Sequence, residues 1–96
     1  MTHLWVCLGL SLALSAQALQ VTVHSPAIES VRLEVFDLSG GRIFDSGPVP
    51  GTTYKWYLQR DDGRPVANGV YLYVFFVRRA DGTEVRSSVG KLAVRR

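Results

Sequence analysis

The chain has 96 residues, of which 47% are hydrophobic and 20% are charged, and its formal net charge is +3. This length allows one domain, and the balance of hydrophobic and charged residues excludes an intrinsically disordered chain. The modest positive charge comes without an RNA- or DNA-binding module, so we expect no nucleic-acid partner.

The N-terminal segment has the pattern of a secretory signal peptide. Leu4 to Leu14 is an apolar run, and Ala16 and Ala18 place small residues at the −3 and −1 positions of a cleavage site. The run is shorter than the roughly 20 residues that a membrane-spanning helix needs. We therefore predict a signal peptide over residues 1–18, no transmembrane segment after its cleavage, and a protein that is secreted, periplasmic or at the cell surface. The alternative is a first strand or helix buried in the fold.

After the leader, short strand-like runs alternate with turn signals. The runs at 19–24 and 31–38 alternate apolar and polar residues, which is the period of a half-buried strand. "SGGR" at 39–42 predicts a hairpin turn, and Asp81-Gly82 predicts the tip of another. The last strand is expected to be interrupted near Gly90. The expected strands cover residues 19–24, 31–38, 42–47, 52–59, 70–79 and 85–96.

Six or seven short strands without an amphipathic helix predict an all-β protein, with an antiparallel β-sandwich over residues 19–96. The strand at 70–77 is apolar or aromatic at every position, so we expect it in the interior of a sheet. We predict that Val70, Leu72, Val74 and Phe76 face the core between the sheets.

The other face of that strand is the candidate docking surface. Tyr71, Tyr73 and Phe75 would form an aromatic stripe there, able to bind a partner protein or a sugar. In the alternative interpretation a loop or terminal segment covers the stripe, or its rings pair with neighbours across the sheet.

Catalytic and metal-binding patterns are absent from the sequence. His24 is the only histidine after the leader. Its neighbour Ser25 would point to the opposite face of a strand, so the two cannot form a nucleophile–base pair. A zinc site needs about four Cys or His ligands, and the only cysteine, Cys7, lies in the leader. We therefore predict no enzyme activity, no catalytic residue, no metal site and no cofactor.

Three stretches carry a resemblance to known families: "VRLEVFDLSGGRIFDSG" (31–47), "WYLQRDDGRPVANGVYLYVFFVRRADGTEV" (56–85) and "KLAVRR" (91–96). They resemble the Ig-like domain of the bacterial flagellar hook-capping protein (FlgD-type) and the C-terminal sorting domains of type IX secretion cargo. The resemblance implies an Ig-like sandwich without catalysis. Its framework residues would be Trp56, Gly63, Gly69 and Tyr71. Its sorting strand would include Lys91, Leu92 and Val94.

The framework positions also have a physical meaning of their own. Gly69 follows Asn68 where a positive φ is expected. Tyr71 is placed to send its hydroxyl back to a loop, as in a tyrosine corner. Trp56 is large enough to contact both sheets.

These observations predict an exported, non-catalytic Ig-like domain that acts by protein–protein contact, in secretion sorting or cell-surface attachment. Addition of a strand at a sheet edge, or the Tyr71, Tyr73 and Phe75 face, would be the docking mode. The alternative is a small carbohydrate- or envelope-binding module that uses the same aromatic residues together with a rim of basic residues.

Overall fold

The computed structural model describes residues 10–14, 18–24, 27–87 and 89–95. These residues form nine strands and no helix, so the all-β prediction is confirmed and no membrane-spanning helix occurs among them. The strands are β1 (Leu10–Leu14), β2 (Leu19–Val23), β3 (Ile28–Phe36), β4 (Arg42–Asp45), β5 (Val49–Pro50), β6 (Thr53–Trp56), β7 (Gly69–Arg79), β8 (Glu84–Arg86) and β9 (Gly90–Val94). The count exceeds the expected six or seven because β1 and the two-residue β5 were not expected and the last strand is split in two.

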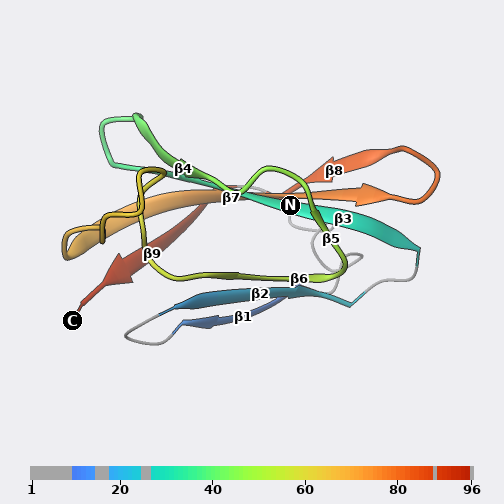
Figure 1. Cartoon of the computed structure of the whole chain (residues 1–96), viewed down its shortest axis with the longest axis horizontal. Coiled ribbons are helices and arrows are strands. Elements are labelled where there is room, and N and C mark those ends of the chain that lie inside the picture. The colour runs from blue at the N-terminus through green and yellow to red at the C-terminus, as the bar shows by residue number, and fades with distance from the viewer. Residues whose placement is uncertain (1–9, 15–17, 25–26, 88, 96) are drawn as a thin grey trace.

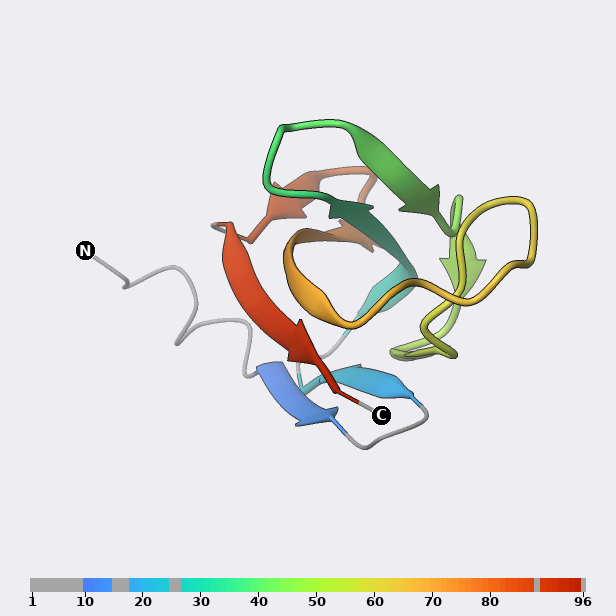
Figure 2. The same ribbon diagram turned by 90° about the vertical axis from the view of Figure 1, so that its left-hand side faces the viewer.

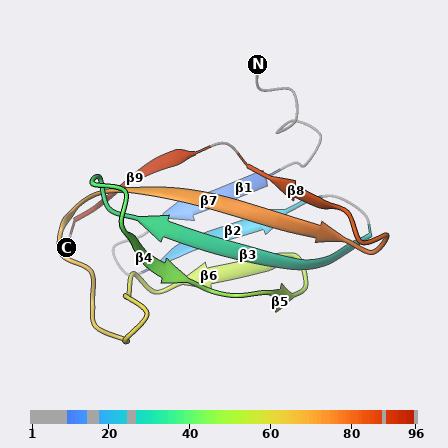
Figure 3. The same cartoon turned by 90° about the horizontal axis from the view of Figure 1, so that it is seen from above.

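Two antiparallel sheets form the layers of a sandwich (Figure 1). The first is three-stranded, in the order β1-β2-β6. The second has six strands, in the order β4-β3-β7-β8, with β5 added to β3 and β9 added to β7. Viewed from above, β7 lies between β3 on one side and the pair β8 and β9 on the other (Figure 3). The long apolar strand is therefore paired along both edges, as predicted.

The facing of β7 is the reverse of the prediction. Tyr71 and Phe75 are buried in the core between the sheets and Tyr73 packs against it. Of the four residues predicted to face the core, Val70 is 43% exposed, Leu72 and Phe76 are partly buried, and Val74 is buried but lies outside the core cluster. The register with β3 explains this, because Phe75 lies opposite the fully buried Leu33. The aromatic stripe is thus covered, as in the alternative interpretation, and it offers no exposed platform to a partner or a sugar.

The core joins the two sheets through large side chains. Trp56 of β6 is 1% exposed, and its ring centroid lies 5.7 Å from that of Phe44, which belongs to β4 in the other sheet. Trp56 therefore contacts both layers. The other buried core residues include Leu19, Val21 and Val23 of β2, Val31, Leu33 and Val35 of β3, and Phe75 and Val77 of β7.

The last strand is interrupted at Ser87, slightly before the expected position at Gly90. The Ser87 N–H donates to the Phe75 carbonyl at 2.7 Å, and the Phe75 N–H donates to the Ser87 hydroxyl at 2.8 Å. A side-chain oxygen thus replaces a carbonyl in the ladder between β7 and the split strand. Gly90 begins β9 opposite Tyr73, and a Cβ there would lie 2.4 Å from the Tyr73 ring. Glycine lets that ring lie against the backbone.

Part of the predicted leader takes part in the fold. Residues 10–14 form β1, which pairs with β2 along all five of its residues. This placement corresponds to the alternative of a first strand within the fold. Most of the predicted cleavage motif, residues 15–17, lies outside the described residues, as do residues 1–9. Cleavage after Ala18 stays a prediction.

Candidate functional site

Three of the residues expected to form the framework hold loops against the sandwich. The Trp56 indole N–H donates to the Gln59 carbonyl at 2.9 Å. The Tyr71 hydroxyl donates to the Ala67 carbonyl at 2.6 Å, which is the contact of a tyrosine corner. Gly69 opens β7 with a φ of +157°. The contacts of Trp56 and Tyr71 hold both ends of the loop between β6 and β7. The framework role of these residues stays a prediction.

Gly63, the fourth framework residue, lies in one of several turns that are closed by a carboxylate. It has a φ of +87°, which favours glycine. Its neighbour Asp62 accepts hydrogen bonds from the side chain and the main-chain N–H of the residue two positions further on. Asp37 and Asp81 do the same in their own turns. These hydrogen bonds lower the pKa of all three carboxyl groups.

The residues expected to form a sorting strand lie in β9, at an edge of the six-stranded sheet. Leu92 and Val94 point inward and are buried, whereas Lys91 is exposed on the outer face opposite Leu72. Within the described residues β9 pairs with β7 alone. Two side chains thus anchor the strand, and its free edge and Lys91 remain accessible.

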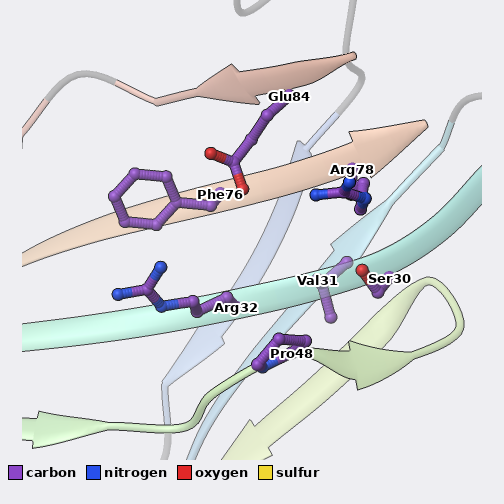
Figure 4. Close-up of a pocket in the computed structure, with 7 residues that line it drawn as sticks. All are labelled: Ser30, Val31, Arg32, Pro48, Phe76, Arg78 and Glu84. Carbon is purple, nitrogen blue, oxygen red and sulfur yellow. The ribbon is translucent and has the colours of Figure 1, made fainter. Parts of the chain in front are cut away.

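A pocket of ≈ 170 Å³ opens on the outer face of the six-stranded sheet. It lies where β3, β7 and β8 run side by side, with Pro48 from the segment before β5 (Figure 4). Figure 4 shows Arg32 and Phe76 projecting from neighbouring strands, and the two are opposite each other in the register. The lining residues are Ser30, Val31, Arg32, Pro48, Phe76, Arg78 and Glu84. No pattern in the sequence predicted this pocket.

Arg32 is held in place at the margin of this pocket. Its Nε donates to Asp45 Oδ1 at 3.0 Å, its Nη2 pairs with Glu34, and its guanidinium lies 5.0 Å from the centre of the Phe76 ring. Hydrogen bonding to Asp45 raises the pKa of Arg32. Partial burial favours a higher pKa for Asp45, but the bonds from Arg32 and Gly47 N–H and the nearby positive charges outweigh it and lower that pKa.

Opposite charges are therefore matched across the outer face. Arg42 lies 3.2 Å from Asp45 and extends the network, and at the other end of the pocket Arg78 lies 3.5 Å from Glu29. Such a surface, with paired charges around an apolar centre at Phe76, suits contact with a protein surface of mixed charge.

The Asp45 network predicts a pH dependence of stability. A carboxyl group whose pKa is lowered in the folded state stabilises the protein above its unfolded pKa, and this stabilisation is lost as the pH falls toward the folded pKa. We expect the free energy of unfolding to fall below about pH 4, with Asp45 contributing about 1 kcal/mol or less. In urea titrations at pH 6 and pH 3, Asp45→Asn should shrink the difference between the two values. An unchanged difference would contradict this role.

The absence of catalytic residues and of a metal site stays a prediction. Among residues 10–14, 18–24, 27–87 and 89–95, no group of three or more His, Cys, Asp or Glu side chains could hold a metal ion. His24 is exposed, and Ser25 lies outside the described residues.

Comparison with known proteins gives a fold but no family. No protein-family model matches the chain, and no curated protein sequence matches it. The crystal structure of dimeric latent PorU from Porphyromonas gingivalis is similar with a TM-score of 0.69 and 21% identity over 88% of this chain. The crystal structure of CopC from Methylosinus trichosporium OB3b is similar with a TM-score of 0.60 and 14% identity, over 88% of this chain and 92% of CopC.

These likenesses have different extents. The chain corresponds to 9% of the length of PorU but to nearly the whole of CopC. At these identities both comparisons establish a shared fold and nothing finer. The resemblance to the flagellar hook-capping domain stays a prediction.

Proposed function

We propose that this chain is an exported, non-catalytic Ig-like domain that acts by contact with a protein of the secretion or cell-surface machinery. The observation that carries the proposal is the fold shared with a part of latent PorU from Porphyromonas gingivalis. The motifs at residues 31–47 and 56–85 resemble type IX sorting domains independently of that likeness. The likeness to CopC, at 14% identity, supports only the fold.

The docking mode that remains is addition of a strand at a sheet edge. The aromatic stripe of β7 faces the core, which leaves the free edge of β9 as the accessible part of the expected sorting strand. Main-chain hydrogen bonds at an edge supply affinity, and outward side chains supply specificity. On β9 these outward side chains are Lys91 and Ala93, both exposed.

Site-specific crosslinking in the producing bacterium tests this proposal. Lys91 would be replaced by a photo-reactive p-benzoylphenylalanine, the cells irradiated, and any covalent adduct identified by mass spectrometry. We expect an adduct with a protein of the secretion or surface machinery, and protein in the medium, the periplasm or at the cell surface.

The same replacement at Lys55 provides the matched control. Lys55 is also exposed on a strand, but it lies on β6 in the other sheet. Equal adducts at the two positions would argue against docking at β9. A protein confined to the cytoplasm, with an intact mass that begins at Met1, would contradict export itself.

A further inference from the structure

The outermost strand of the three-stranded sheet comes from the segment that is predicted to be removed as a leader. β1 pairs antiparallel with β2 along its whole length, from Leu10 opposite Val23 to Leu14 opposite Leu19. Figure 2 shows the two strands side by side at the bottom of the molecule. The other side of β2 pairs with β6. The outer edge of β2 is therefore covered by β1.

Cleavage after Ala18 would separate these two strands, because the cut lies between them. N–H groups alternate between the two sides of a strand. The Val23 N–H donates to the Thr52 carbonyl at 2.8 Å, on the side of β6. The N–H groups of Gln20 and Thr22 consequently point toward β1. Once β1 is removed, these groups and their neighbouring carbonyls form an unpaired edge, which we call the β2 edge.

The β2 edge has none of the features that keep sheet edges from pairing. Its inward side chains, Leu19, Val21 and Val23, are buried, and its outward side chains, Gln20 and Thr22, are uncharged. Within residues 19–23 there is no Lys, Pro or acidic residue, and the pairing with β1 is free of bulges. An edge of this kind readily accepts another strand of the same alternating pattern.

We propose that a second copy of this chain pairs with the β2 edge after the leader is removed, β2 against β2. β1 reads "LSLAL" and β2 reads "LQVTV", so both have apolar residues at the first, third and fifth positions and uncharged residues between them. The β2 strand of a second copy therefore fits where β1 fits. It also becomes free in the same cleavage.

The pairing is self-complementary in the antiparallel register. With Val21 on the two-fold axis, Leu19 of one copy lies opposite Val23 of the second copy, and Gln20 lies opposite Thr22. The buried side chains of both copies then share one face, and β6-β2 of each copy joins into a continuous four-stranded sheet. Retained β1 fills the same edge and keeps the chain monomeric.

The inference rests on the proposed export, because only removal of the leader opens the β2 edge. The test is therefore made on the protein purified from the medium or periplasm of its own bacterium. Intact mass gives its first residue, and light scattering after size exclusion gives its oligomeric state. We expect a chain that begins at Leu19 and is a dimer. A chain that begins at Leu19 but is monomeric at high micromolar concentration would overturn this inference and leave export standing. A chain that is exported but retains residues 1–18 would overturn this inference alone, and a chain found only in the cytoplasm with residues 1–18 retained would overturn both.

Two charge variants test the register. Gln20→Lys with Thr22→Lys places like charges opposite each other twice in the dimer, and it should weaken dimerisation about tenfold. Gln20→Lys with Thr22→Glu places Lys opposite Glu twice and should restore the dimer. Both variants carry the same lysine beside Lys55 of β6, so they differ only at position 22. Equal dimer dissociation constants for the two variants would place the dimer interface on another surface and overturn the inference.

Discussion

Replacing Phe75 by Ala is expected to lower the free energy of unfolding by about 3–5 kcal/mol, the usual cost of removing a buried phenylalanine. Phe75 is 1% exposed in the core between the sheets. The same change at Phe76 should cost about 1–2 kcal/mol, since that ring is half-buried on the outer face and loses mainly its contact with Arg32. The two substitutions remove the same atoms from adjacent positions of one strand, so each is the control for the other.

Urea titrations followed by circular dichroism would measure both losses. Parallel slopes in the two titrations would show that the change lies in stability and not in the extent of the unfolded state. A greater loss at Phe76 than at Phe75 would contradict the observed facing of β7 and restore the one predicted from the sequence.

The facing of a strand could be predicted wherever polar residues mark its outer side. In β2 and β3 the alternation assigns Leu19 and Val21, and likewise Leu33 and Val35, to the inside, and all four are buried. Both strands follow the period-2 rule, because one face of each sheet lies on the core.

β7 has no such marker between Val70 and Val77, and either phase fits an unbroken apolar run. Its phase is set by neighbours distant in sequence. Leu33 of β3 brings Phe75 to the inner face, and Gly90 of β9 makes room for the ring of Tyr73. A single strand read in isolation cannot reveal such pairings.

The outer-face pocket could not be predicted either, because it is formed by strands that are distant in sequence. Alternation along β3 does send Arg32 outward, as observed. Its partners, however, come from other strands, Asp45 from β4 and Phe76 from β7. The pairing of β3 with β4, which brings Asp45 near, also contains a bulge between Val35 and Phe36. The turns were easier to predict from the sequence, because Asp and Gly stabilise a turn through interactions within the few residues of the turn itself.

Replacing Trp56 by Ala is the other substitution with a large expected effect. It should lower the free energy of unfolding by about 3–5 kcal/mol, a large part of the 5–15 kcal/mol available to a small domain. The indole contacts the Phe44 ring of the other sheet, and its N–H donates to the Gln59 carbonyl. Trp56→Phe keeps much of the apolar contact but loses that hydrogen bond, so we expect an intermediate loss of about 1–3 kcal/mol.

Tyr57 provides the matched control, because this neighbouring aromatic residue is 58% exposed and contacts mainly the Lys55 ammonium. Tyr57→Ala should change the free energy of unfolding by about 0.5 kcal/mol or less. Circular dichroism is the suitable probe, because Trp56 is the only tryptophan beyond the predicted leader and its removal abolishes the tryptophan fluorescence of the domain. Equal losses at positions 56 and 57 would contradict the role of the indole in joining the two sheets.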